Sequence, residues 1–157
     1  MTRFRAILAV VVLAMAQLQT AGLGIAAEGD AGAEAGGRLQ TADQLLAQGN
    51  AARGKRALAQ AVVLYENALT IKEEVLGSSH VALAPVLEVL AAVQKELGQN
   101  KQALTYAQRA LEINERVLGA NHVRVAVNLN DIAGLHQAAG RYAVALPLYQ
   151  RGLAILE

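Results

Sequence analysis

The chain has 157 residues, which suits one domain, and its 54% hydrophobic residues are ample for a buried core. Ala, Leu and Val dominate, with one Phe and no Trp, so closely packed helices and an all-α fold are predicted. A formal charge of +1 without a cluster of Lys and Arg argues against nucleic acid and anionic membranes as partners, and the lack of Cys excludes disulfides and thiolate chemistry.

The first 27 residues have the layout of a secretory signal peptide. Two arginines precede an apolar run at 6–16, and a stretch of small residues follows before the first acidic residue. We expect cleavage after Ala26 or Ala27, which predicts a periplasmic or secreted protein. The alternative is an uncleaved anchor in the inner membrane. Polar residues at 17–20 weaken it, because a membrane span needs about 20 apolar residues.

Residues 28–39 are predicted to form a flexible linker, because EGDAGAEAGG at their start offers no apolar face to bury. The rest of the chain repeats one frame at an offset of 42 residues, as VLGSSHVALA at 75–84 and VLGANHVRVA at 117–126 show. A period of this size is typical of a solenoid whose units bury one another's faces. The predicted array spans residues 40–157, with units at 40–76, 83–118 and 125–157.

Each unit contains two stripes of apolar residues at helical spacing and is therefore predicted to be a helix hairpin. Gly98 and Gly140 stand where the first helix must end in a left-handed residue, and Arg56 holds that place in the first unit. Pro85 and Pro147 are predicted to lie near helix starts, where a missing N–H costs little.

The joints between units carry the repeated LG…H frame. Gly77 and Gly119 should end one hairpin, because glycine readily adopts the left-handed conformation of a helix end. Ser79 or Asn121 should then accept hydrogen bonds from the free N–H groups of the next helix.

The last unit, VAVNLNDIAGLHQAAGRYAVALPLYQRGLAILE, resembles a tetratricopeptide repeat, and the 42-residue period with its LG…H joints is similar to the kinesin light chain type. The residues that match the family's packing frame are Leu129, Ile132, Ala133, Gly140, Tyr142, Ala145, Tyr149 and Gly152. The resemblance implies a right-handed α-solenoid of three helix-turn-helix hairpins. It also implies a non-enzymatic adaptor or scaffold that binds a protein or peptide partner without a cofactor.

The inner face of such a solenoid is where this family binds extended peptides or helices. The positions expected to line it, three from each first helix, are Leu46, Asn50, Arg53, Glu88, Ala92, Lys95, Asn130, Gly134 and Gln137. Arg53, Lys95 and Gln137 share one repeat position, so two cations should lie side by side and suit an acidic peptide segment. The alternative is an inner face that is only solvated.

The final helix is predicted to expose apolar side chains. Leu146, Leu148, Leu153 and Ile155 repeat positions that in earlier copies can pack against the following unit. This surface predicts a homo-oligomer through the C-terminal helix or a docked partner, since a large exposed apolar patch usually marks an interaction site. A self-associating structural array and a fragment of a longer array are the alternative interpretations.

No catalytic, metal or cofactor site is predicted. Glu73, Glu74 and Glu115 lie on helix surfaces, with no Ser, Cys or His spaced to form a nucleophile and base. His80 and His122 are interpreted as capping residues at the joints rather than metal ligands. Equivalent positions in neighbouring repeats lie about 8 to 10 Å apart, whereas a ligand nitrogen lies about 2 Å from zinc.

Overall fold

The computed structural model describes residues 30–157, so the predicted signal peptide at 1–27 lies outside the described residues. The chain divides into two units, Met1–Gly37 and Arg38–Glu157. In the first unit, residues 30–37 are helical, which differs from the flexible linker predicted for 28–39. Ala and Glu stand between the glycines there, and both favour a helix. No helix among the described residues is long and apolar enough to cross a membrane.

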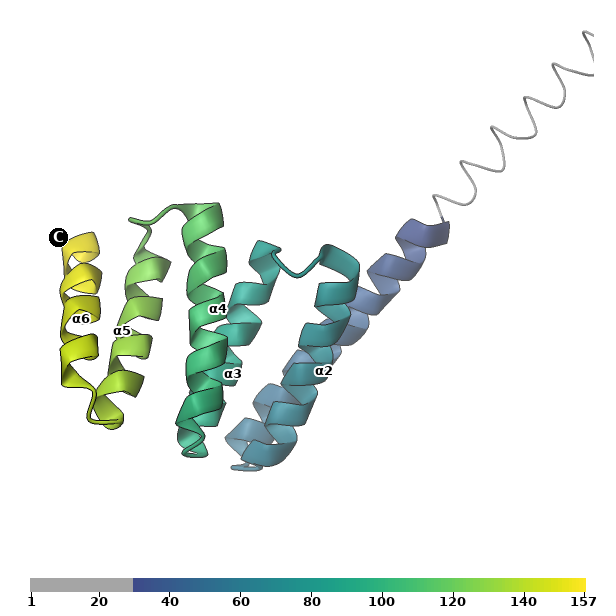
Figure 1. Ribbon diagram of the computed structural model, residues 1–157. Helices are drawn as coiled ribbons and strands as arrows, with labels where there is room; N and C mark the ends of the chain where they lie inside the picture. The colour runs from purple at the N-terminus through teal and green to yellow at the C-terminus, as the bar shows by residue number, and fades with distance from the viewer. Residues whose placement is uncertain (1–29) are drawn as a thin grey trace, which may run out of the picture. The chain divides into compact units, whose positions relative to one another are not determined.

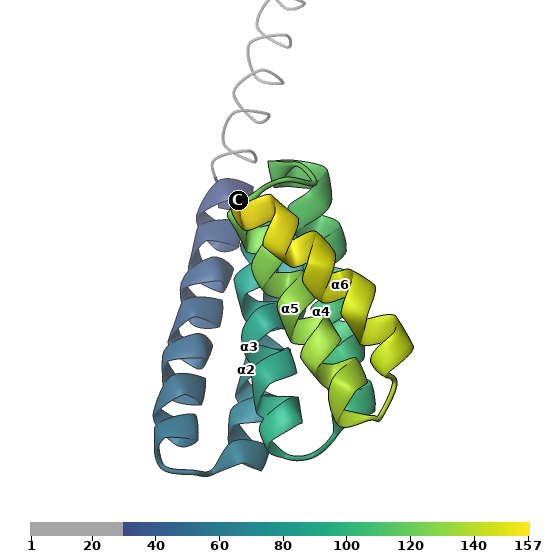
Figure 2. The same ribbon diagram turned by 90° about the vertical axis from the view of Figure 1, so that its left-hand side faces the viewer.

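The second unit is a row of α-helical hairpins, and no strand occurs in the described part of the chain (Figure 1). Residues 38–54 are helical and are followed by α2 (Leu58–Leu76), the 3₁₀ turn η1 (Val81–Leu83), α3 (Ala84–Glu96), α4 (Asn100–Leu118), α5 (Val123–Ala138) and α6 (Tyr142–Leu156). Helix 38–54 pairs with α2, α3 with α4, and α5 with α6, as Figures 1 and 2 show. The prediction of an all-α fold built from helix hairpins is confirmed.

Left-handed residues end the first helix of each hairpin. The φ angle is 75° at Gly98, 71° at Gly140 and 62° at Arg56, so all three predicted stops are confirmed. The arginine is the strained one, because its Cβ crowds the following carbonyl at a cost of about 1–2 kcal/mol. Pro85 lies in the first turn of α3 as predicted. Pro147 lies inside α6 instead, because α6 begins directly after the Gly140 turn.

Histidine caps the helix that follows each joint. Nδ1 of His80 accepts a hydrogen bond from the N–H of Ala82 at 3.2 Å, and Nδ1 of His122 accepts from the N–H of Arg124 at 3.1 Å. Each ring satisfies an N–H group that the first helical turn leaves free. The predicted capping role of both histidines is confirmed. The expectation that the preceding Ser79 or Asn121 caps the helix is wrong, because each lies one position before the N-cap.

Apolar side chains pack between successive hairpins. The cluster between the first and second hairpins includes Val62, Tyr65 and Leu69 of α2 and Val86, Leu90 and Val93 of α3. The cluster between the second and third hairpins consists of Ala91, Ala103, Ala107, Ile132 and Leu135. Three of these five buried side chains are alanine, and larger, partly buried side chains such as Leu104 and Leu111 pack against them.

An ion pair repeats between the second helices of successive hairpins. Arg109 of α4 pairs with Glu73 of α2, and Arg151 of α6 pairs with Glu115 of α4 at 2.6 Å. Both partners shift by 42 residues from one pair to the next. The glutamates that the sequence places on helix surfaces are therefore structural contacts of the repeat.

Candidate binding groove

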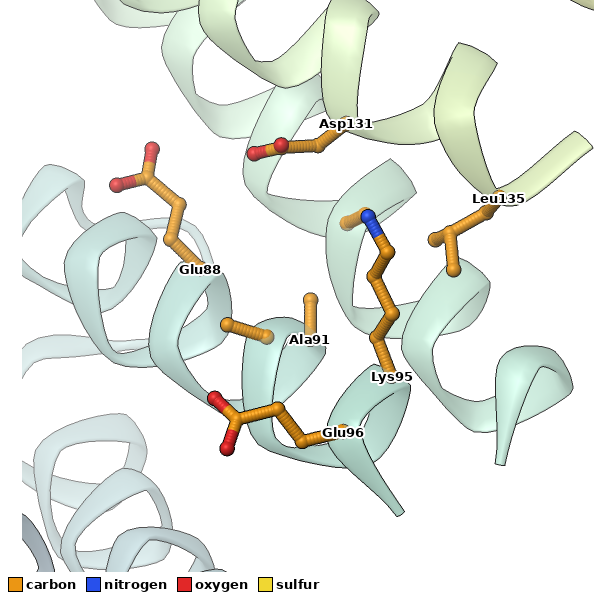
Figure 3. A pocket seen from close by; sticks show the side chains of 8 residues that line it. Glu88, Ala91, Lys95, Glu96, Asp131 and Leu135 are labelled. Atoms are coloured by element: carbon orange, nitrogen blue, oxygen red, sulfur yellow. The ribbon is translucent and has the colours of Figure 1, made fainter. Parts of the chain in front are cut away.

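A pocket of about 430 Å³ lies at the junction of the second and third hairpins (Figure 3). Its lining consists of Glu88, Ala91, Ala92, Lys95 and Glu96 from α3, Ala107 from α4, and Asp131 and Leu135 from α5. The short alanine side chains leave the space, and charged side chains surround it. The volume falls in the range of about 300–1,000 Å³ that is usual for ligand pockets.

Two opposite charges face this pocket without a partner. Figure 3 shows the Lys95 ammonium and the Asp131 carboxylate extending toward the same space from α3 and α5. Within the described residues neither makes a hydrogen bond or an ion pair. Removal of water raises the pKa of Asp131; the Lys95 cation partly offsets this rise, and the Glu88 charge adds to it. Among the described residues, the Asp131 carboxylate is thus stabilised only by the nearby Lys95 charge, and no hydrogen bond holds either exposed side chain in place.

Arg53 does not contribute a second free cation to the groove. Its Nε donates to Oε1 of Glu96 at 3.0 Å, and another guanidinium nitrogen also pairs with this carboxylate. The pair links the first hairpin to α3. The expected neighbouring cations at the positions of Arg53 and Lys95 are therefore not both available to a ligand.

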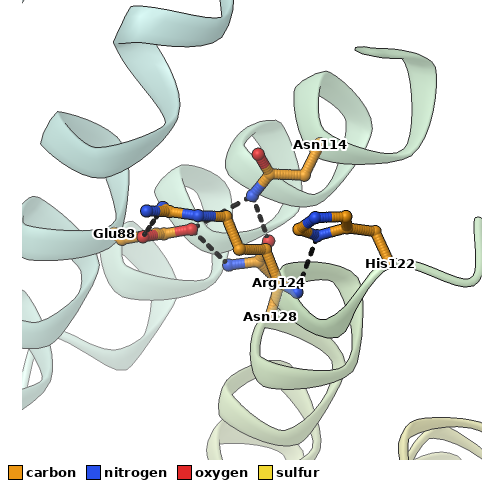
Figure 4. A network of polar contacts seen from close by, with 5 residues as sticks. All are labelled: Glu88, Asn114, His122, Arg124 and Asn128. Carbon is orange, nitrogen blue, oxygen red and sulfur yellow. Dashed lines mark hydrogen bonds and ion pairs between the residues drawn. The ribbon is translucent and has the colours of Figure 1, made fainter. Parts of the chain in front are cut away.

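Glu88 is held in a polar network that joins α3, α4 and α5 (Figure 4). Its Oε1 accepts from the side-chain amides of Asn114 at 3.1 Å and Asn128 at 3.0 Å. The Asn114 amide also donates to Oδ1 of Asn128 at 2.7 Å, and Arg124 lies 3.6 Å from the second Glu88 oxygen. Glu88 thus borders the pocket, but its charge is already compensated by these donors.

The other groove candidates lie apart from this pocket or beside it. Leu46 and Asn50 line a second pocket of about 130 Å³, where the Tyr65 hydroxyl donates to Asn50 Oδ1 at 2.8 Å. Gln137 accepts from the Tyr149 hydroxyl at 2.9 Å. Two groove candidates remain. The Oδ1 of Asn130 lies close to Gly152 of α6. Gly134 lies beside Lys95, because a Cβ added to this glycine would lie 3.7 Å from the Lys95 Nζ.

Sequence reasoning missed several residues of the site. Asp131, Glu96 and Leu135 line the pocket although none belongs to the repeat positions chosen for the inner face. The buried pair Asn114 and Asn128 was also missed, although two asparagines within apolar helix stripes are a usable signal for a buried polar contact. Among residues 30–157, no group of three His, Asp or Glu side chains is placed to hold a metal ion.

The four candidates at the chain's last helix separate into two environments. Leu146 and Leu153 are more than half exposed. Leu148 packs against the cluster of the second junction, and Ile155 is half-buried. Tyr142 and Leu156, which were not among the candidates, are exposed on α6 as well.

Known proteins share both the sequence pattern and the architecture of this chain. The family model described as tetratricopeptide repeat matches residues 40–116 and 90–157. The chain belongs to the tetratricopeptide repeat family. Members of this family typically bind protein partners and are generally not enzymes. No curated protein sequence matches the chain.

Several solved structures share the fold. BtubC (BKLC) from P. vanneervenii is 25% identical with a TM-score of 0.68, over 73% of this chain and 45% of that one. The tetratricopeptide domain of Arabidopsis FLU is 18% identical with a TM-score of 0.66, over 76% and 97%. Repeats of a putative kinesin light chain from P. anserina are 22% identical with a TM-score of 0.63, over 73% and 55%. The chain thus spans about half the length of the first and third of these structures.

Proposed function

We propose that this chain is an exported, non-enzymatic adaptor that binds a segment of another protein in the pocket between α3 and α5, in a bacterial envelope or outside the cell. The observation that carries the proposal is the unpaired Lys95 and Asp131 across a pocket of about 430 Å³ with alanines in its wall. Tetratricopeptide repeats typically bind protein partners, and helical solenoids commonly bind them on an extended concave surface.

The chemistry of the pocket favours an extended peptide segment. Lys95 donates hydrogen bonds and suits a carbonyl or carboxylate oxygen, whereas Asp131 accepts and suits an N–H group or a cationic side chain. A peptide backbone presents both kinds of group at every residue, with a rise of about 3.3 Å per residue in an extended chain. Ala91, Ala92 and Ala107 allow that backbone to come close. A purely acidic segment is disfavoured, because Arg53 is already paired and Asp131 would repel it.

Charge reversal tests this site. Lys95→Glu and Asp131→Lys should each reduce binding to an array of extended peptides at least tenfold. Both variants should also fail to capture the proteins that the wild type binds from an envelope extract. Each reversal replaces the attraction between Lys95 and Asp131 by repulsion, but stability should fall only slightly because both side chains are exposed. Lys101→Glu and Glu112→Lys are matched controls at exposed positions of α4. Equal binding by pocket variants and controls would remove the pocket as the site.

Export is a separate part of the proposal, supported by the arginines and apolar run at 1–27. Mass spectrometry of the protein recovered from the envelope or medium should find a new N-terminus at Ala27 or Glu28. An intact Met1 in the membrane fraction would indicate an anchored protein instead.

A further inference from the structure

One face of α6 carries a continuous apolar stripe, formed by Tyr142, Leu146, Tyr149, Leu153 and Leu156 and called the α6 stripe below. Successive members are four, three, four and three residues apart, so they lie on one side of the helix. Four of them are 54–66% exposed, and Tyr149 is half-buried beside α5.

The same repeat positions are covered in the first hairpin. Leu146, Tyr149 and Leu153 correspond to Val62, Tyr65 and Leu69 of α2, where packing against α3 leaves 9%, 1% and 6% exposed. With roughly 150–250 Å² per large side chain, the exposed part of the α6 stripe is on the order of 450 Å². Patches of a few hundred Å² on soluble proteins commonly mark interaction sites.

The N-terminal face of a second copy does not suit this stripe. To cover α2, α3 uses Val86, Leu90 and Val93, whereas helix 38–54 has Gln44, Gln48 and Ala51 at the same repeat positions. Head-to-tail stacking would therefore bury glutamine amides against leucines, which costs free energy because those amides would lose their water. An open chain of copies is disfavoured by the same argument.

We propose that the α6 stripe pairs with the α6 stripe of a second copy, antiparallel and related by a two-fold axis near Tyr149. The stripe has nearly the same spacing in both directions, so Tyr142 faces Leu156 of the other copy and Leu146 faces Leu153. The contact is self-complementary and closes at two chains.

The charges at the helix ends agree with this orientation. Antiparallel pairing brings Glu157, at the carboxyl end of α6, to the amino end of the other α6. That end begins after Arg141 without a side-chain cap, so its first N–H groups are free to interact with an anion. A parallel pair would instead bring the two Glu157 carboxylates together.

The size of the contact predicts a weak dimer. α6 has 15 residues and is therefore about 22 Å long. The stripe offers less than the roughly 800 Å² per partner of a standard stable interface. We expect reversible dimerisation with a dissociation constant on the order of tens of micromolar.

Light scattering and sedimentation of the full chain from about 1 to 500 µM test the stoichiometry. The apparent mass should rise about twofold and then level off. Leu146→Gln with Leu153→Gln should keep the chain monomeric. Val63→Gln with Val117→Gln is the matched control, because these valines are 55% and 48% exposed but lie outside the stripe. A wild type that stays monomeric, a mass that rises beyond the dimer, or an equal effect of the control pair would each overturn the proposal.

Cysteine cross-linking tests the orientation, because the chain has no native Cys. Gln150→Cys places a thiol next to the two-fold axis and should form a disulfide-linked dimer under mild oxidation. Ala143→Cys, near the amino end of the same helix, should not cross-link to itself. The reverse result would show that the pair is not antiparallel. Binding of a synthetic peptide of residues 79–97, which includes all of α3, to a chain that remains monomeric would assign the face to a different helix.

Discussion

Replacement of Glu88 tests how strongly the polar junction of α3, α4 and α5 stabilises the fold. Glu88→Ala removes the oxygen that accepts from the amides of Asn114 and Asn128. Asn114 keeps its bond to Asn128, but Nδ2 of Asn128 loses its hydrogen-bond acceptor. Both asparagines are 1% exposed, so water has little access to replace the lost oxygen.

The expected loss is about 2–4 kcal/mol in the free energy of unfolding. An unsatisfied buried donor costs about 1–3 kcal/mol, and a hydrogen bond to a charged group contributes about 1.5–3 kcal/mol. The ion pair with Arg124 adds little, because the arginine side chain is 51% exposed and 3.6 Å away. Glu88→Gln should cost about half as much, since its amide oxygen still accepts.

Urea unfolding followed by circular dichroism measures these differences. Glu112→Ala, an exposed glutamate of α4, is the matched control and should change the free energy of unfolding by less than about 0.5 kcal/mol. The explanation is refuted if Glu88→Ala is no more destabilising than this control. A Glu88→Gln variant as unstable as Glu88→Ala would show that the charge, not the accepted hydrogen bonds, accounts for the stabilisation.

Three further substitutions have defined outcomes. Gly49→Ala should lower the free energy of unfolding in urea by about 1–3 kcal/mol, because the new Cβ would lie 2.5 Å from the buried Tyr65 ring. Gly54→Ala is the control and should cause no such loss, because its Cβ would meet nothing within 4 Å. Arg56→Gly should stabilise by about 1 kcal/mol by relieving its left-handed conformation, and an unchanged melting temperature would contradict that strain. Burial and a hydrogen bond to Glu66 raise the pKa of Tyr106 to about 12. The unfolded chain therefore loses this proton at lower pH than the folded chain. Wild-type stability should fall relative to Tyr106→Phe as pH rises from about 10 to 12. Parallel plots of stability against pH for the two proteins would contradict this explanation.

The sequence predicts the hairpins well because their signals recur. A stop residue at Gly98 reappears at Gly140, and the joint histidines reappear 42 residues apart, so each local signal is supported by its copy. The side-chain partners within the groove were less predictable. Whether Arg53 faces a ligand or Glu96 depends on how two long side chains cross between hairpins, which helical spacing alone does not determine.

Asp131 illustrates the same limit in the candidate site. Its repeat position gives its helix and approximate face, but its lack of a partner follows from the directions that Lys95 and Glu88 take. Pro147 shows that even a helix start depends on context, because the turn at Gly140 sets the first residue of α6 before the proline is reached.

The repeating arginine–glutamate pair between second helices gives a rule for engineering longer arrays. Glu157 occupies the position of Glu73 and Glu115, one further repeat along the chain. A copy of residues 74–118 fused after Glu157 would bring a copy of Arg109 to that carboxylate and copies of Val86, Leu90 and Val93 to the face of α6. The added hairpin would occupy the surface otherwise available to a second copy, so the extended protein should be a monomer with one more inter-hairpin junction.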